Sequence, residues 1–217
     1  MKTDSIIKIL EGLYGKKNDY LPKELDRIET LSINRVNPDR SLANVDFSDL
    51  LKFKNLRRLN IDGCIIDVDT MAYINTITYL KELCLYNCEI VDDIYPFITN
   101  SKIKEMVVSN TNLNLSLLGG YFEKLTLDNV PLKVIKPHVE VLNIFNCKLD
   151  KFENILDYNF EELVVSIEQY DAFEKEFNEC GRRIVVLEDN GQFVYKKVGF
   201  DNGQIWETWY FKNRIIK

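Results

Sequence analysis

A frame of apolar residues, Leu-x-x-Leu-x-Leu-x-x-Cys, recurs along this chain of 217 residues. Three copies keep the cysteine, at Cys64, Cys88 and Cys147, and the others keep only the apolar spacing. The copies begin at residues 28, 56, 80, 103, 122, 139 and 160, so successive intervals are 28, 24, 23, 19, 17 and 21 residues. A frame that returns at such intervals predicts a solenoid of about seven stacked units across residues 28–183.

Each unit is expected to add one short strand, centred on its Leu-x-Leu, to a curved parallel sheet. The return segments that follow Val36, Ile66, Ile90 and Leu149 are long enough for a helical turn or two. Those between residues 114 and 138 are too short for a proper helix, and Gly119-Gly120 interrupts them further. The expected fold class is therefore α/β, with an irregular helical and loop layer on the convex side.

Residues 1–27 are predicted to form a helical cap over the open end of the first unit. Asp4 or Ser5 can cap a helix in which Ile6 and Leu10 share a face. Gly15 is expected to end that helix, and Pro22 is expected to lie in a linker.

The last segment, residues 184–217, changes character. Three β-rich runs, 184–189, 193–198 and 205–212, are separated by Asn190-Gly191 and Asn202-Gly203. Asn-Gly between such runs is a strong hairpin signal. We therefore expect an antiparallel β meander that caps the array, preceded by a helix that carries Phe173, Phe177 and Cys180 and ends at Gly181.

The repeats resemble the leucine-rich repeat superfamily, over roughly residues 28–183, and the best two are similar to its cysteine-containing subtype. The pattern that carries this resemblance is Cys-Ile-Ile-Asp from Cys64 and Cys-Glu-Ile-Val-Asp from Cys88. Proteins of that subtype are often substrate-recognition subunits of ubiquitin ligases with an F-box ahead of the repeats. Residues 21–25, Leu-Pro-Lys-Glu-Leu, are similar to an F-box opening, but the first repeat follows too soon for the remaining F-box helices.

The three frame cysteines are predicted to have a packing role. A small thiol at the strand exit can be buried while it donates a hydrogen bond to a nearby carbonyl oxygen. This role implies reduced thiols in a reducing compartment. The spacing of the five cysteines contains no CxxC pair, so we expect neither a metal site nor a cofactor.

Charge and hydropathy narrow the choice of partner. The formal net charge is −6, which divides into −9 before Gln192 (23 basic and 32 acidic residues) and +3 from Gln192 onward (five basic and two acidic). An acidic array disfavours nucleic-acid binding. The sequence has neither a run of apolar residues long enough for a membrane helix nor a signal-peptide pattern at Met1, so we expect a monomeric cytoplasmic protein without a membrane partner.

Candidate binding residues follow from strand alternation, which turns the residues between the frame positions away from the core. One predicted row lies between the two leucines and another lies just after them. Exposed aromatic and arginine side chains dominate interface energetics. The predicted partner-binding set on the concave face is Arg58, Asn60, Asp62, Tyr86, Asp128, Asn143 and Phe145. A run of asparagines, Asn87, Asn110, Asn129 and Asn146, is interpreted as turn chemistry rather than ligand binding.

The sequence argues against an enzyme. The sole histidine, His138, is expected three strands away from Cys84, the one cysteine of the repeats that faces outward, which is about 14 Å at strand spacing. Asp62 and Asp128 are expected to be equally far apart. We expect a non-catalytic module that binds a protein partner, as an adaptor or inhibitor would. The alternative is a structural or self-assembling protein that uses the C-terminal meander.

Overall fold

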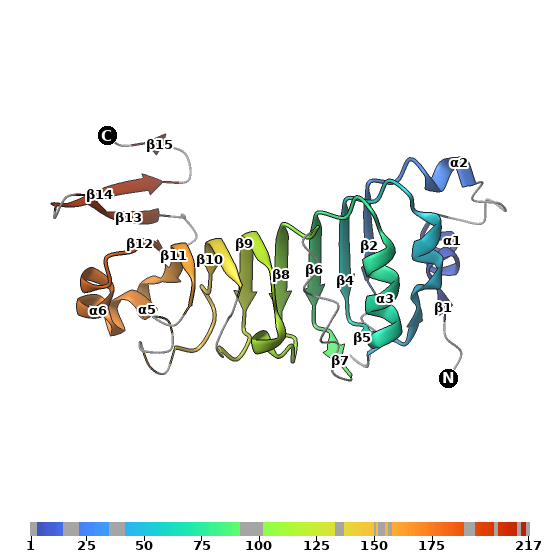
Figure 1. Ribbon diagram of the computed structural model, residues 1–217, viewed down its shortest axis with the longest axis horizontal. Helices are drawn as coiled ribbons and strands as arrows, with labels where there is room; N and C mark the ends of the chain where they lie inside the picture. Colours follow the sequence, from blue (N-terminus) through green and yellow to red (C-terminus); the bar gives the residue numbers. More distant parts are fainter. Residues whose placement is uncertain are drawn as a thin grey trace.

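The computed structural model describes residues 4–14, 22–34, 42–91, 102–132, 137–149, 151, 155, 158–188, 194–201, 204–211 and 214–215. The protein is an elongated α/β molecule in which the strands lie side by side along the long axis, with the N-terminal helices at one end (Figure 1).

One sheet of eleven strands organises the described chain, and its strands follow each other in sequence order. The first eight are parallel. They are β2 (Thr30–Asn34), β4 (Arg58–Asp62), β6 (Glu82–Tyr86), β8 (Glu105–Ser109), β9 (Tyr121–Asp128), β10 (His138–Asn143), β11 (Phe160–Ser166) and β12 (Arg183–Glu188). The last three are antiparallel: β13 (Val194–Asp201), β14 (Gln204–Phe211) and β15 (Arg214–Ile215).

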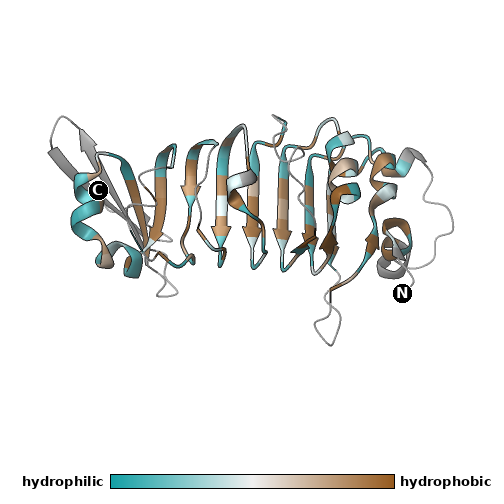
Figure 2. Ribbon diagram, turned by 60° about the horizontal axis from the view of Figure 1, so that its bottom comes forward, coloured by the Kyte–Doolittle hydropathy of each residue, from teal (hydrophilic) through white to brown (hydrophobic). Residues whose placement is uncertain are grey.

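The frame residues form the core, as their spacing predicts. The parallel register aligns Leu59 with Leu83 and then with Met106, and these side chains are fully buried. Within β2 buried and exposed residues alternate, because successive side chains point to opposite faces of a strand. Hydrophobic residues run along the parallel strands and alternate with hydrophilic ones (Figure 2). One continuous hydrophobic cluster runs from Ile6 to Val186.

The return segments differ in structure as their lengths predict. After β3 (Val45–Asp46) comes the 3-10 helix η1 (Phe47–Lys52), and after β5 (Ile65–Ile66) comes α3 (Val68–Thr76). In the short central segment, the described residues form the 3-10 turn η2 (Leu115–Leu117) and no helix of greater length. Each of the three is capped by an Asx side chain that accepts a backbone N–H: Asp46, Asp67 and Asn114. The helices expected after Ile90 and Leu149 fall mostly outside the described residues.

The N-terminal cap contains the predicted helix, α1 (Ile6–Tyr14), whose Ile6 and Leu10 are buried. β1 (Asp4–Ser5) precedes it and pairs with β3, and β5 pairs with β7 (Glu89–Ile90). Gly15 lies outside the described residues. The expectation of a linker at Pro22 was wrong, because Pro22 begins the short helix α2 (Pro22–Leu25), as the fixed φ of proline allows at a first helical position.

A long-range cap joins α1 to the first return segment. Asp49, in η1, accepts a hydrogen bond from the backbone N–H of Ile7 at 3.0 Å and one from Lys52 Nζ at 2.7 Å. Burial of Asp49 raises the pKa of its carboxyl, but the hydrogen bonds from Lys52 and Ile7 outweigh it and the pKa is lowered. The charged carboxylate is thus favoured in the folded chain.

This cap predicts an acid-sensitive N-terminus. Because the pKa of Asp49 is lower in the folded chain than in the unfolded chain, its contribution is present above the ordinary carboxyl pKa and is lost as the pH falls through the folded value. We expect the free energy of unfolding to fall with pH more steeply below about pH 4 in the native protein than in Asp49→Asn. Urea unfolding from pH 3 to 7 measures this, and identical slopes for the two proteins would contradict the assignment.

The C-terminal end required a correction. Residues 184–189 were expected to begin the antiparallel meander, and β12 does pair antiparallel with β13. It also pairs in parallel with β11, with Leu163 opposite Ile184 and Val165 opposite Val186, so the parallel sheet extends one strand further than expected. The antiparallel pairing then continues from β13 to β14. The helix expected before it is two helices, α5 (Ile167–Ala172) and α6 (Glu174–Glu179).

The break between the two helices lies at Phe173, whose φ of −137° and ψ of 32° are not helical. Gly181 follows α6 with a φ of +66°, which suits its expected role as the terminator.

The frame cysteines pack as expected. Cys64, Cys88 and Cys147 are buried. The Cys64 thiol donates to the backbone oxygen of Asp62, the Cys88 thiol to those of Tyr86 and Ile61, and the Cys147 thiol to that of Leu127, at distances of 3.2–3.6 Å. Burial raises the pKa of Cys88 and of Cys147 to about 11, so these thiols stay protonated near neutral pH.

No helix in the described part of the chain has the length and apolar character needed to cross a bilayer.

Candidate functional site

The face of the parallel sheet that points away from the core, here called the outer face, carries three rows of side chains set by the strand register. The first row is Thr30, Arg58, Glu82, Glu105, Lys124, Val141, Glu162 and Arg183. The middle row is Ser32, Asn60, Cys84, Val107, Thr126, Asn143, Val164 and Val185. The last row, at the strand exits, begins with Asn34, Asp62, Tyr86, Ser109 and Asp128, as expected from alternation.

Arg58 lies in an ion pair that spans two strands. Its guanidinium nitrogens lie 2.5 and 2.6 Å from Glu82 Oε2, and half of the Arg58 side chain is exposed. Because Glu82, Cys84 and Tyr86 are alternate residues of β6, they share the outer face. The Cys84 thiol donates to Glu82 Oε1 at 3.7 Å. Glu82, which is not in the predicted partner-binding set, therefore holds Arg58 in place.

Cys84 and Tyr86 are both held in their neutral forms. Burial raises the pKa of the Cys84 thiol, and the charge of Glu82 adds to that effect. Burial, followed by the influence of Cys84, raises the pKa of Tyr86 to about 12. Cys84 is only 3 % exposed, whereas Tyr86 is half-buried. Tyr86 is thus available for contact as a neutral phenol.

The other predicted residues of β4 are tied to their neighbours. Asn60 donates from Nδ2 to Ser32 Oγ at 3.0 Å. Asp62 accepts from Asn87 Nδ2 at 2.7 Å and is the register partner of Tyr86. These contacts fix the side chains without removing them from solvent, since Asn60 and Asp62 remain partly exposed.

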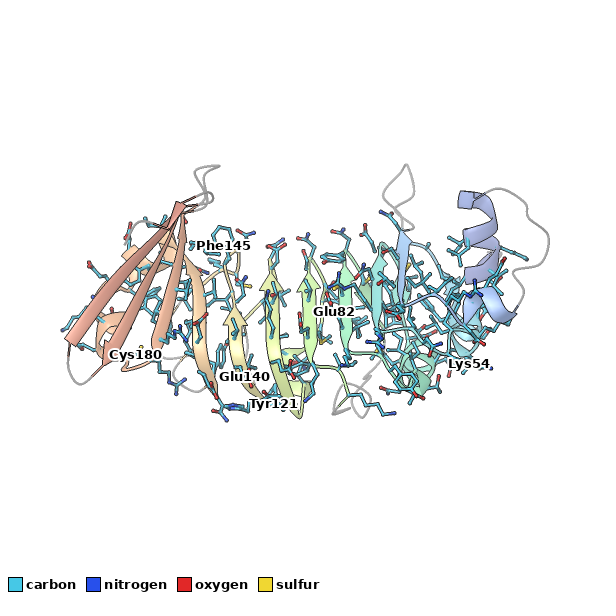
Figure 3. The ribbon with its side chains drawn as sticks, turned by 90° about the horizontal axis from the view of Figure 1, so that it is seen from above. Lys54, Glu82, Tyr121, Glu140, Phe145 and Cys180 are labelled. Atoms are coloured by element: carbon cyan, nitrogen blue, oxygen red, sulfur yellow. The ribbon has the colours of Figure 1, made fainter. Side chains whose placement is uncertain are left out.

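A second group of predicted residues lies on β9 and β10. Asp128 accepts from Ser109 Oγ at 2.7 Å and from Asn146 Nδ2 at 2.8 Å. Asn143 Oδ1 accepts the backbone N–H of Phe145 at 3.0 Å, so the turn that ends β10 is fixed by an Asx side chain. Phe145 is half-buried and lies at the edge of the sheet where the strands end (Figure 3).

The structure therefore divides the predicted set into two groups. Arg58, Asn60, Asp62 and Tyr86 lie together on β4 and β6, and Asp128, Asn143 and Phe145 lie together on and after β9 and β10. One strand, β8, separates the groups. Asp62 and Asp128 are three strands apart, about 14 Å at the usual strand spacing.

The asparagine run marks a turn at the strand exits, with a different mechanism from the one expected. Asn87, Asn110 and Asn129 all have a φ of 49°, and Gly63 occupies the equivalent place with a φ of 71°. Asparagine tolerates this left-handed conformation better than most residues. Their side chains bond mainly across strands, as in Asn129 Nδ2 to Asn110 Oδ1 at 2.6 Å.

This backbone conformation predicts the effect of substitution. Asn110→Ala should lower the free energy of unfolding by about 1–2 kcal/mol, because alanine is strained at positive φ and the bond to Asn129 is lost. Asn110→Gly should recover part of this loss, as Gly63 does naturally. Urea unfolding of both variants measures the difference, and an alanine variant at least as stable as the glycine variant would contradict the prediction.

A further cluster, which sequence reasoning missed, lies where strands β8 to β11 begin. The Tyr121 ring stacks on His138 with centroids 5.7 Å apart, and Lys104 Nζ lies 4.7 Å from the centre of the same ring. The Tyr121 hydroxyl donates to Glu140, which raises the pKa of Tyr121 to about 12. Tyr121 and Glu140 lie at the opposite edge from Phe145 (Figure 3). His138 and Cys84 are three strands apart, as expected.

The middle row changes from polar to apolar along the sheet. It is polar at Ser32 and Asn60 and apolar at Val164 and Val185, both of which are nearly buried. Val185 was missed because its strand was assigned to the meander. Taken together, the rows of the outer face offer polar and aromatic side chains, held in place by their neighbours, for contact with a partner.

Among the described residues no group of three His, Cys, Asp or Glu side chains is placed to hold a metal ion.

Comparison of the chain with models of known protein families, with curated proteins and with solved structures gives no match.

Proposed function

We propose that this protein is a leucine-rich repeat solenoid that binds another protein on its outer face, as a non-catalytic adaptor or inhibitor. The repeat assignment is supported by the coincidence of sequence frame and structure: each of the seven frames supplies one strand of the parallel sheet, and its aliphatic residues lie in the core. In this proposal the outer face is the concave side of the solenoid, and the return helices lie on the convex side.

The observation that carries the binding proposal is the composition of the last row. Side chains of different chemistry follow one another there, from Asp62 to Tyr86 to Ser109 to Asp128. Most of them are held by hydrogen bonds to neighbouring strands. Fixed and heterogeneous groups favour recognition of one particular partner, because each position matches a different complementary group.

The test is capture of a partner from the lysate of the native host, followed by measurement of its affinity for variants. We expect Tyr86→Ala and Arg58→Glu to weaken binding at least about tenfold each, as aromatic and arginine anchors do. Lys54→Glu is the matched control, since it makes the same charge change at an exposed residue away from the outer face (Figure 3). Full affinity in both outer-face variants, with circular dichroism unchanged, would refute the site.

A second candidate function, self-assembly, is favoured by the edge of the antiparallel strands. β14 has eight residues, but in the described part of the chain β15 pairs only with Tyr210 and Phe211. An unpaired strand edge can pair with another chain. Light scattering of the full chain and of a chain ending after β12 tests this, and a monomeric mass for both at high concentration would exclude it.

A further inference from the structure

The last row of the outer face repeats one arrangement twice: an aspartate on one strand and an aromatic side chain on the next. Asp62 on β4 stands opposite Tyr86 on β6 in the register. Asp128 lies at the end of β9, and Phe145 follows the neighbouring strand β10. All four side chains are partly exposed. Each pair offers a carboxylate beside a ring at the surface.

Hydrogen bonds orient both carboxylates and leave capacity for a ligand. Asp62 accepts from Asn87, and Asp128 accepts from Ser109 and Asn146. A carboxylate has about four acceptor sites, so each can accept at least one further donor. The donors that already bind them are uncharged amides and a hydroxyl, so in the described part of the chain neither carboxylate is hydrogen-bonded to a cationic side chain.

The cations of the outer face lie in a different row. Arg58 and Arg183 are in the first row, and each is engaged with a glutamate of the adjacent strand, at 2.5 and 2.9 Å. Lys124 is also in the first row, opposite Glu105. The described last row, by contrast, has two carboxylates and no basic side chain. A partner that crosses this row therefore meets negative charge next to aromatic rings.

We infer that the partner presents a basic segment to the last row, with two Lys or Arg side chains that each pair with one aspartate and pack on the adjacent ring. This inference rests on the proposed function and names the chemistry of the partner. Arg and Lys bind both carboxylates and aromatic faces, so each acid–aromatic pair suits one such side chain. The two pairs are about 14 Å apart, which an extended chain spans in about four residues.

The test uses a displayed library of random twelve-residue peptides, selected on the full-length chain. We expect enrichment of peptides with two basic residues separated by three to five positions. For an enriched peptide, titration against Asp62→Asn/Asp128→Asn should show an affinity reduced about tenfold or more, from two lost ion pairs and weakened ring contacts. Binding should also weaken as salt rises from about 0.05 to about 0.5 M, since the charges are exposed.

The matched control is Glu105→Gln/Glu161→Gln, which removes two carboxylates outside the last row and leaves the same net charge as the test variant. Affinity within about twofold of the native protein is expected for this control. Equal losses in the control and test variants would overturn the inference, because general acidity alone would then explain binding.

The remaining outcomes separate this inference from the proposed function. Enriched peptides without basic residues that still lose affinity on Tyr86→Ala would overturn the basic partner and leave the binding face intact. Peptides indifferent to every outer-face substitution, or no enriched peptide, would count against both. A second copy of the chain as the occupant would appear as a mass that grows with concentration, and that result too would overturn the inference.

Discussion

Replacement of Leu125 by alanine is expected to lower the free energy of unfolding by about 2–5 kcal/mol, the range for a large side chain removed from a packed core. Leu125 lies in β9, near the middle of the sheet, and is fully buried. Its register partners are Met106 on one side and Leu142 on the other, which are buried as well. The cavity would therefore open between the buried side chains of three adjacent strands, β8, β9 and β10.

The adjacent residue provides the control. Lys124 lies in the same strand on the outer face and is exposed, so Lys124→Ala should change the free energy of unfolding by no more than about 0.5 kcal/mol. Urea unfolding followed by circular dichroism measures both variants. Similar losses at the two positions would mean that the two faces of β9 are assigned wrongly, and the binding surface with them.

Gln169 is the second position where we expect a large effect. This side chain is 8 % exposed and connects α5 to the preceding unit. Its Oε1 accepts the backbone N–H of Ser166 at 2.8 Å, completing a capping box. Its Nε2 donates to the backbone oxygens of Ile144 and Cys147, at 2.9 and 2.5 Å. Gln169→Leu keeps a similar volume but leaves these buried groups without partners, which should cost about 2–4 kcal/mol.

Asp171→Ala is the control for Gln169→Leu, because Asp171 lies in the same helix and is exposed. Its effect should stay within about 0.5 kcal/mol. Thermal unfolding compares the two variants with the native chain. If Gln169→Leu melted like Asp171→Ala, the hydrogen bonds of Gln169 would contribute no net stability.

The strands were predictable because two patterns in this sequence agree: the alternation of apolar and polar residues within each frame, and the recurrence of the frame along the chain. Alternation within each frame identifies the core side, and the recurrence of the frame identifies the strands themselves, as at Leu59 and Leu83. The parallel pairing of the strand at residues 183–188 was not predicted, because its frame lacks an apolar residue at position 181, where a glycine ends the helix. The antiparallel partner expected across Asn190-Gly191 was correct, because β12 pairs with β13.

The outer rows were also predictable, since their members follow from the frame. The contacts among these side chains were not, because they depend on which residues of different units become neighbours. Glu82 pairs with Arg58 across 24 positions of sequence, and Tyr121 pairs with Glu140 across 19. No local pattern marks such pairs. Knowledge of the register, applied strand by strand, would have revealed both.

The order of the strands in the large sheet follows the order of the chain without exception. A pull on the two ends would therefore load the strands one after another, and the molecule should lengthen in small steps rather than give way at once. The same strand order bears on evolution. Duplication or deletion of one strand with its return segment between β8 and β10 would keep the remaining strands in sequence order, and it would change mainly the length of the outer face.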